Sequence, residues 1–506
     1  MKVASRSPAD SVGPRLLRSP WLWLIGLAHL VYWLTAFPNP DEAYYWLWGQ
    51  HLDWSYYDHP PFHAWVQGMF SLLGHGAFVL RLPTLISNGL FFSVYYQIAR
   101  YLYGLQVQWT WSVIFLCCWS SPLYFLFLTL AWHDQWLITF SLLSAYWFIR
   151  FLDGVWYGRG ASRYLYGGAA ALGLAGLCKY TAVFVGLAVL GVIVSQPRLR
   201  RLLWDKRLYG AGAIAALFFL PILIWNLHND WLSFQYYLTR SVDSGGGPTL
   251  RPDAVFFFWL TAALILSPPL VWVLGRAATA KVELDSPTYR PMAVGLFLTS
   301  TGMLSLVGLF STALYYWNIL AYLLLLPLLP LYFLDLKADS LRHAGWLSGI
   351  QILGAVVAWC LVINYCLFPI AALFGPDGDP DGRMSFGWSQ VTAVMDDYAS
   401  QHDLLLTTDY RSASALAYAL DDTRVLAVSE RIDQFDVWAD SRQLLGRSAL
   451  VLADDWHPFI YAGESQGPLQ LEPGWQRLTT VPVRRFGIKI KDYYLYSGVV
   501  QAISVE

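Results

Sequence analysis

The sequence predicts an α-helical polytopic membrane protein with a C-terminal soluble α/β domain. The chain of 506 residues is 56% hydrophobic, 17% aromatic and only 13% charged. Soluble proteins carry roughly 25% charged residues. Apolar runs long enough to cross a bilayer recur through residues 1–375 and stop there. These observations exclude a disordered chain, a coiled coil and an ordinary soluble enzyme.

The distribution of charge predicts two domains. Residues 376–506 hold 30 of the 67 charged residues, about 23% of that segment, against about 10% of residues 1–375. The Gly- and Pro-rich segment 374–380 marks the change. We therefore expect a transmembrane domain at 1–375, with an outer loop at 38–75, and a soluble domain at 376–506.

Basic residues set the predicted orientation, because Lys and Arg favour the cytoplasmic side of short loops. The basic N-terminus is expected in the cytoplasm, which leaves the loop 38–75 and the C-terminal domain outside. About eleven spans are expected, near 21–37, 77–99, 109–130, 136–152, 209–227, 254–274, 292–310, 319–336 and 346–368, with two short limbs in 167–195.

The apolar run 167–195 is predicted to be a helical hairpin. Basic residues precede it and follow it at 198–207, and only a hairpin keeps both groups in the cytoplasm. Its tip falls near Lys179, recessed from the outer surface because each limb has fewer than 20 residues. A recessed Lys needs an anionic partner, which can be a phosphate or a carboxylate such as Asp41 or Asp134.

The C-terminal part has the alternating pattern of an α/β domain. Short apolar runs bounded by turn residues predict strands, and an Ala- and Leu-rich run predicts a helix. The strands are expected at Leu404–Thr407, Val425–Val428, Ala449–Ala453, Val481–Val483 and Ile488–Tyr496, and the helix at Ser412–Leu420.

The outer loop 38–75 is rich in acids and aromatic rings. Its carboxylates are Asp41, Glu42, Asp53 and Asp58. Aromatic rings at this level are typical of the interface belt of any membrane protein. Carboxylates beside aromatic rings also suit a sugar site, because acids polarise hydroxyl groups and rings stack on the apolar faces of pyranoses. We expect Tyr44, Tyr57 and His59 to contact such a substrate.

Further candidates lie in the other predicted outer segments. Asp134 is expected in a short turn, either as a solvated residue or as a second acid that faces Asp41. Lys179 and Arg240 are candidates for binding a phosphate, because both residue types recognise that group well. Arg81 and Arg251 are more typical of contact with lipid headgroups.

Other function classes lack support. The net charge of −1 gives no electrostatic case for nucleic acid. The five cysteines lie in or beside apolar runs, which is typical of packing and not of a disulfide framework. The chain has no Walker loop, GxGxxG motif, HExxH motif or Ser nucleophile elbow. A sugar donor at the outer face would therefore have to be lipid-linked.

The motifs resemble those of a known family. The segments 41–48 and 56–61 are similar to the first outer loop of bacterial GT-C glycosyltransferases. Among these, the chain more closely resembles the relatives of dolichyl-phosphate-mannose–protein mannosyltransferases and of the lipid A aminoarabinose transferase. Asp134 matches an acid after the third span, although Trp132-His133-Asp134 departs from the common Thr-Pro-Asp context. The segments 177–182, 225–235, 316–318 and 408–418 fit as well.

The resemblance implies a transferase of the bacterial inner membrane. It would move a sugar from a polyprenyl-phosphate donor to lipid A, another glycan or a protein on the periplasmic face, with inversion at the anomeric carbon. The resemblance assigns the catalytic roles to Asp41, Glu42 and Asp134, and donor phosphate binding to Lys179 and Arg240. In the soluble domain it assigns Tyr410 and Arg411 to the acceptor side. It also allows a divalent metal held by Glu42 and His59.

The sequence is also compatible with two other functions. A polyprenyl-linked sugar transporter or flippase would be expected to have inverted repeats and helices broken at the midplane, and the sequence has no visible repeat. A non-catalytic glycan-binding membrane protein would have no need of both Asp41 and Lys179.

Overall fold

The computed structural model describes residues 19–241, 250–335, 340–375, 378–429, 431–439, 441–459 and 475–500. The chain forms two compact units. Unit 1 contains Met1–His29, His59–Phe62 and Thr84–Trp359, and unit 2 contains Leu30–Asp58, His63–Pro83 and Cys360–Glu506. Most of the predicted outer loop therefore belongs to the same unit as the C-terminal region. The predicted boundary after residue 375 marks a change of composition and does not coincide with a boundary between the units.

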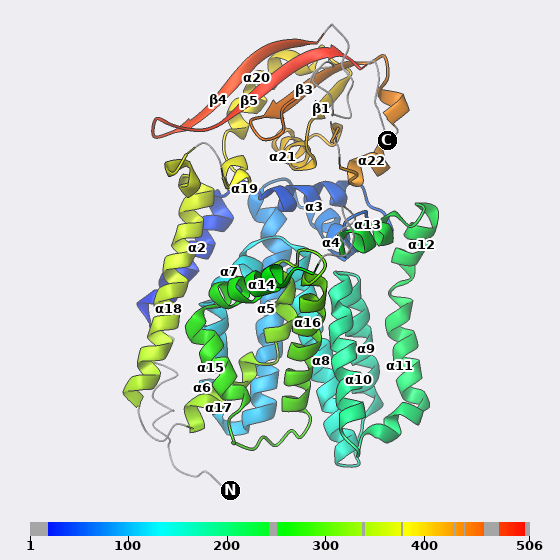
Figure 1. Ribbon diagram of the computed structural model, residues 1–506, viewed down its shortest axis with the longest axis vertical. Helices are drawn as coiled ribbons and strands as arrows, with labels where there is room; N and C mark the ends of the chain where they lie inside the picture. The colour runs from blue at the N-terminus through cyan, green and yellow to red at the C-terminus, as the bar shows by residue number, and fades with distance from the viewer. Residues whose placement is uncertain are drawn as a thin grey trace. The chain divides into compact units, whose positions relative to one another are not determined.

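Unit 1 is built from helices (Figure 1). Its helices are α6 (Val107–Trp119), α7 (Pro122–Thr129), α8 (His133–Trp156), α9 (Ser162–Gly176), α10 (Val183–Ser195), α11 (Lys206–Leu217), α12 (Leu220–His228), α13 (Leu232–Ser241), α14 (Pro252–Leu266), α15 (Pro268–Ala278), α16 (Tyr289–Gly308) and α17 (Leu329–Asp335). Short 3-10 helices include η2 (Gly104–Gln106), η3 (Tyr180–Ala182), η4 (Arg200–Trp204), η5 (Tyr315–Tyr322) and η6 (Leu326–Leu328). Helices α2 (Pro20–Thr35), α5 (Ala77–Tyr103) and α18 (Ser340–Val362) have residues in both units.

The apolar helices confirm a protein with several membrane spans. Four helices of the described chain are long and apolar enough to cross a bilayer, or up to eight spans if each bent pair counts as one. This count is lower than the predicted eleven. Part of the difference is length, because α9 has 15 residues and α10 has 13, which is short for a full crossing.

Prolines break several of the predicted spans. The predicted span near 254–274 consists of α14 and α15, which meet at an angle of 96°. Ser267 lies between them with φ +93°, and Pro268 begins α15. Proline has no N–H to continue the helical ladder, and it disfavours helical backbone at the preceding residue.

The helix break predicted near Lys179 is present. Helix α9 ends at Gly176 and α10 begins at Val183, with the short helix η3 between them. Lys179 itself is extended, with φ −163° and ψ 142°. The two limbs lie beside α8 and α11 in unit 1 (Figure 1). The side of the membrane that each end faces remains a prediction.

Unit 2 contains two helices from the first loop and a mixed sheet. Its helices are α3 (Pro40–Gln50), α4 (Phe62–Ser71), α19 (Pro380–Met384), α20 (Trp388–Ala399), α21 (Tyr410–Leu420) and α22 (Gln434–Trp438). Helix α3 begins with a capping box: the Asn39 side chain accepts from the helix and the Glu42 side chain accepts from the Asn39 N–H. Pro40, at the first helical position, suits this start because its missing N–H would have no partner there.

The five strands confirm the predicted strand positions. They are β1 (Leu404–Thr407), β2 (Val425–Ala427), β3 (Ser448–Asp454), β4 (Gln476–Arg485) and β5 (Ile488–Val499), in the order β2-β1-β3-β5-β4. Strand β1 pairs in parallel with β2 and β3, while β5 pairs antiparallel with β3 and β4. Helix α21 connects β1 to β2 and extends the predicted helix by two residues at its start.

The sheet has an apolar core and a tight hairpin. Leu406, Ala449 and Val451 are buried in the core cluster. Phe486 and Gly487 connect β4 to β5, and both have positive φ angles, 51° and 79°. Two-residue turns of this kind match the right-handed twist of antiparallel strands.

Candidate active site

A buried ion pair lies at the break between α9 and α10. The Lys179 Nζ is 2.8 Å from Asp134 Oδ1, and both side chains are almost fully buried. The Lys179 ammonium also lies 5.7 Å from the centre of the Tyr316 ring, a cation–π contact. The Asp134 carboxylate therefore compensates the positive charge of the buried Lys179 ammonium. Asp134 is not the solvated turn residue that was one of the two expectations.

Local backbone structure positions both Asp134 and Lys179. Asp134 is in the first turn of α8, where a carboxylate is favoured by the positive end of the helix dipole. Lys179 is held by its backbone, because its N–H donates to the carbonyl of Ala175 at 3.0 Å. The same turn is tied to the segment that carries His59, since the Phe62 N–H donates to the Leu177 carbonyl at 3.1 Å.

Two histidines extend this cluster. His133 Nε2 lies 3.1 Å from Asp134 Oδ2. The His59 and His133 rings lie 4.0 Å apart between centroids, and His59 Nδ1 lies 2.8 Å from the Tyr237 hydroxyl. The sequence named Asp134 as a possible partner of Lys179 and singled out His59 independently, and the structure brings all three into one group of titratable side chains.

Unit 2 carries the acids of the first loop. Asp41 lies in the first turn of α3 and is half-buried, and its N–H donates to Asn39 Oδ1 at 3.0 Å. Glu42, the next residue, is fully buried. The two adjacent acids thus have different environments, and Asp41 is the one with access to solvent.

Glu42 forms a buried fork with Arg81. Arg81 Nε donates to Glu42 Oε1 at 2.9 Å and Nη2 donates to Oε2 at 2.7 Å. The Asn39 N–H also donates to Oε2, at 2.9 Å. Arg81 Nη1 donates to the carbonyls of Tyr32 and Ala36. This pair holds the end of α2 to the start of α3, so the expectation that Arg81 contacts lipid headgroups is wrong. Both Glu42 oxygens are thus engaged by Arg81, and the catalytic role of Glu42 stays a prediction.

Asp58 joins the first loop to the C-terminal region. Its Oδ2 accepts from the Tyr44 hydroxyl at 2.8 Å, and its Oδ1 accepts from Arg431 Nη2 at 2.8 Å. The Tyr44 hydroxyl also accepts from the Gln434 N–H, and Gln434 Oε1 accepts from the Tyr57 N–H at 2.7 Å. Tyr44 and Tyr57, expected at the substrate, are thus buried in this junction.

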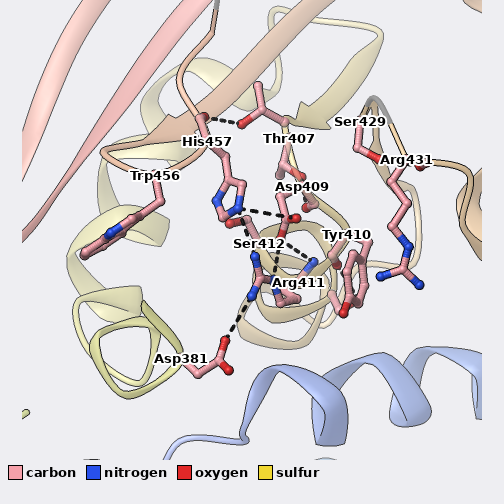
Figure 2. A network of polar contacts seen from close by, with 12 residues as sticks. Asp381, Thr407, Asp409, Tyr410, Arg411, Ser412, Ser429, Arg431, Trp456 and His457 are labelled. Atoms are coloured by element: carbon pink, nitrogen blue, oxygen red, sulfur yellow. Dashed lines mark hydrogen bonds and ion pairs between the residues drawn. The ribbon is translucent and has the colours of Figure 1, made fainter. Parts of the chain in front are cut away.

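Arg411 occupies the centre of a polar network at the start of α21 (Figure 2). It donates to Asp409 Oδ1 at 3.0 Å and to Asp381 Oδ1 at 3.2 Å, and its Nη2 lies 2.9 Å from His457 Nε2. Asp409 also caps α21 by accepting from the Arg411 N–H. These contacts fix the Arg411 side chain, which is predicted to contact the acceptor.

Tyr410 lies between two guanidinium groups. The Arg411 and Arg431 groups lie 5.8 and 5.3 Å from the centre of its ring, and Figure 2 shows the ring between them. Burial, together with the carboxylates of Asp41 and Asp58, raises the pKa of Tyr410 well above its usual range. Its hydroxyl is therefore neutral at physiological pH and can both donate and accept a hydrogen bond.

A second buried charge pair supports the network. Lys491 Nζ is 2.7 Å from Asp454 Oδ2, and both residues are buried. Asp454 Oδ1 accepts from the N–H groups of Trp456 and His457. Burial opposes ionisation of Asp454, but its contacts with His457 and Lys491 outweigh that effect and hold its pKa well below the usual range. Asp454, which contacts His457, is therefore ionised at neutral pH.

The other predicted positions have different outcomes. Arg251 is half-exposed and lies 3.7 Å from Asp253, a weak surface pair that is compatible with its expected headgroup contact. Arg240 belongs to α13, but its side chain lies outside the described residues. The predicted metal ligands Glu42 and His59 are not part of any suitable cluster, because the described ranges contain no group of three or more His, Cys, Asp or Glu side chains that could hold a metal ion.

Several residues of these networks were not predicted. Arg431 and His457 lie in irregular segments and Gln434 begins the short helix α22, and single polar residues in such segments give no periodic signal. Asp58 was visible as one of four loop carboxylates, but nothing in the sequence distinguished it from Asp53. Its partner is more than 370 residues away in the chain.

Several known proteins are similar to this chain in sequence or in fold. Residues 58–225 match the model of the dolichyl-phosphate-mannose-protein mannosyltransferase family. The chain is 26% identical over 397 residues to the lipid A galacturonosyltransferase RgtD of Rhizobium johnstonii, covering 76% of this chain and 77% of that protein. The crystal structure of ArnT from Cupriavidus metallidurans bound to undecaprenyl phosphate has a similar fold, with a TM-score of 0.59 and 16% identity over 96% of this chain and 99% of that one. The apo structure of ArnT is similar, with a TM-score of 0.58 and 15% identity over 96% and 98% of the two chains.

The fold and the matches define a membrane glycosyltransferase of the GT-C type, as the sequence resemblance predicts. Within that class, residues 58–225, about a third of the chain, are similar to the dolichyl-phosphate-mannose-protein mannosyltransferase family. That segment includes His59, Asp134 and Lys179, the three predicted residues that cluster in unit 1.

Proposed function

We propose that the protein transfers a sugar from a polyprenyl-phosphate donor to a lipid A-like glycolipid at the periplasmic face of a bacterial inner membrane. The observation that carries this proposal is the Lys179–Asp134 pair, a buried cation and acid inside the segment that matches the family model. The donor class is supported by the family description and by the undecaprenyl phosphate bound to ArnT. The acceptor class is supported by the similarity to RgtD.

Lys179 is proposed to hold the donor phosphate. Only one of its three N–H donors is needed for Asp134 Oδ1 at 2.8 Å. An additional anion at the ammonium would be stabilised in this dry environment, where charges interact more strongly than in water. The same contact would stabilise the negative charge that develops on the lipid phosphate when the glycosidic bond breaks.

Asp41 is proposed to activate the acceptor hydroxyl. It is half-buried, whereas both oxygens of the neighbouring Glu42 are engaged by Arg81. A carboxylate with access to solvent can accept the proton of a hydroxyl group as that group attacks. Direct attack on the anomeric carbon would displace the lipid phosphate and invert the configuration there. Tyr410 and Arg411 are proposed to contact the acceptor glycan.

An apolar cavity in unit 1 supports a lipid substrate. It has a volume of about 400 Å³ and lies among α14, α15, α16 and η5, with lining residues that include Phe258, Leu274, Phe297 and Asn318. An engineered apolar cavity of about 150 Å³ binds benzene. By that comparison, the cavity can accept part of a hydrocarbon chain.

The proposal is tested with purified protein in vesicles, a polyprenyl-phosphate sugar labelled in the sugar, and lipid A as acceptor. Transfer of label to lipid A with release of polyprenyl phosphate is the expected result. Movement of intact donor across the bilayer without transfer would indicate a flippase. Binding of donor without either event would indicate a non-catalytic glycan-binding protein. Either of the last two outcomes would overturn the proposal.

A further inference from the structure

Six exposed cations gather at one end of the helices of unit 1. We call this group the basic rim: Arg159, Arg163, Arg198, Arg200, Arg201 and Lys206. They come from the connection that follows α8, the start of α9, the segment around η4 and the start of α11. In Figure 1 the α8–α9 and α10–α11 connections lie at the same end of these helices. The rim therefore combines segments that are separate in the sequence.

Side-chain contacts hold these segments together. Arg201 Nη2 donates to the Val155 carbonyl at 3.2 Å, which joins η4 to the last turn of α8. The Arg198 guanidinium lies 4.8 Å from the centre of the Trp156 ring. Arg207 Nη1 donates to Ser162 Oγ at 3.2 Å, which joins α11 to α9. These contacts hold the segment around η4 and the start of α11 against the end of α8 and the start of α9, so the rim belongs to one packed region.

Within the described ranges, no acidic side chain forms an ion pair with a rim cation, and the ion pair in this region is Arg207–Asp205. The sequence from 155 to 210 contains one acid, Asp205. Both Asp205 oxygens accept from Arg207, which is not one of the six rim cations. The positive charge of the rim is therefore available to an external anion.

The surface beside the rim is apolar and aromatic. Trp204, Tyr157 and Tyr209 are 86%, 61% and 65% exposed, and rings of this kind favour the headgroup level of a bilayer. One face of α10 exposes Val183, Leu187, Leu190 and Val194, which repeat at helical spacing and end near the rim. An anion bound at the rim would thus have a strip of hydrocarbon surface for an attached acyl chain.

We propose that the basic rim binds the phosphodiester headgroup of an anionic phospholipid, with one acyl chain along α10. This site is separate from the proposed donor site. Lys179 follows the C-terminal end of α9, whereas the rim lies at its N-terminal end, and α9 has 15 residues. At 1.5 Å per residue, the two sites are separated by roughly 20 Å along the helix. Basic clusters between membrane helices are known to bind anionic headgroups.

The test removes two rim charges without removing a described contact. Arg159→Gln/Lys206→Gln is the test variant, because both side chains are exposed and make no hydrogen bond or ion pair in the described ranges. Arg276→Gln/Lys281→Gln is the matched control, since it also removes one exposed Arg and one exposed Lys from unit 1. In the sequence, the control pair is followed closely by two exposed acids, Glu283 and Asp285.

Native mass spectrometry measures the affinity of each purified protein for phosphatidylglycerol, with phosphatidylcholine as the neutral comparison. The wild type should prefer phosphatidylglycerol at least tenfold. At about fivefold per basic residue near an anionic surface, the test variant should lose roughly 30-fold and the control variant less than threefold. Equal affinities in the test and control variants, or no preference over phosphatidylcholine, would overturn the proposal.

Two measurements on the wild type complete the test. Phosphatidylglycerol binding should weaken steeply between 50 and 500 mM NaCl, because salt screens exposed charges. Millimolar inorganic phosphate should leave binding unchanged, since the site as proposed requires the lipid chain. Insensitivity to salt, or displacement by inorganic phosphate, would contradict a phospholipid site even if the test variant did not fold.

Discussion

Lys179 and Asp134 form an ion pair in the interior of unit 1, with 2.8 Å between Nζ and Oδ1 and almost no exposure of either side chain. The pair joins the first turn of α8 to the break between α9 and α10. Replacement of one partner leaves the other as an uncompensated buried charge. Such losses typically cost about 3–5 kcal/mol, whereas replacement of both partners by apolar residues is often neutral.

The first prediction concerns the stability that this pair provides. Lys179→Met should lower the free energy of unfolding by about 3–5 kcal/mol, and Lys179→Met/Asp134→Leu should recover most of that loss. Thermal unfolding in detergent, compared between the single and double variants, measures the effect. A double variant that is no more stable than the single one would show that the pairing is not what stabilises this turn.

The second prediction concerns the donor phosphate. Lys179→Ala should weaken the binding of polyprenyl phosphate by the folded protein, because it removes the proposed cation. Asp134→Asn should retain or strengthen that binding, since it removes a negative charge 2.8 Å from the same cation. Affinity and melting temperature are measured on both variants. If Lys179→Ala lowers only the melting temperature, Lys179 is a structural partner of Asp134 and does not hold phosphate.

The third prediction separates Glu42 from catalysis. Glu42→Gln leaves Arg81 buried without its counter-charge, and should destabilise the protein by about 3–5 kcal/mol while the folded fraction keeps its transfer activity. Asp253→Asn is the control, because Asp253 is 62% exposed and forms only a surface pair with Arg251. The control should change stability by no more than about 1 kcal/mol. Loss of specific activity in folded Glu42→Gln would support the predicted catalytic role of Glu42 and contradict this expectation.

The fourth prediction concerns pH. Burial and the nearby Asp436 carboxylate raise the pKa of Asp433 to about 8. Between the pKa of the unfolded chain, about 4, and pH 8, the folded protein holds a proton that the unfolded chain has released. Stability should therefore fall as pH rises through this window, by at most about 1.4 kcal/mol per pH unit from this group.

Asp433→Asn provides the check on this effect. Asn can still accept from the Phe435 N–H, as Asp433 Oδ1 does at 2.8 Å, so the start of α22 should be preserved. The difference in melting temperature between wild type and variant should grow from pH 5 to pH 8 in favour of the variant. A constant difference across that range would mean that Asp433 is ionised in the folded protein.

Much of the fold follows from local patterns in the sequence. Apolar runs give the helices, and short apolar stretches give strands such as β1 and β3, because burial of an apolar face or run is the main determinant of both. Basic residues on both sides of the apolar run 167–195 predict a break near Lys179. The structure has this break between α9 and α10. The sharp bend at Ser267–Pro268 could not be predicted from the sequence. Proline also occurs inside helices that stay continuous, such as α5, so a proline alone does not predict a break.

Asp134 was one of two carboxylates expected as a possible partner of Lys179, and it is the one that pairs with it, but the partners of Arg81 and Arg431 could not be predicted. Arg81 has the sequence context of a headgroup contact, yet its partner Glu42 is 39 residues away and the pair is fully buried. Arg431 and Asp58 are 373 residues apart. Such pairings depend on how elements that are distant in the chain pack together, and one sequence carries no signal for that.

The most direct test of the account is the initial rate of sugar transfer by Asp41→Asn. Asn keeps the size of the side chain and removes the charge, and Asp53→Asn in the same loop serves as the control. Loss of one general base typically reduces the rate by about 10²–10⁴. We predict a loss of that size for Asp41→Asn, with an unchanged melting temperature, and a rate close to wild type for Asp53→Asn. Transfer by folded Asp41→Asn at the wild-type rate would contradict the central claim that this acid activates the acceptor.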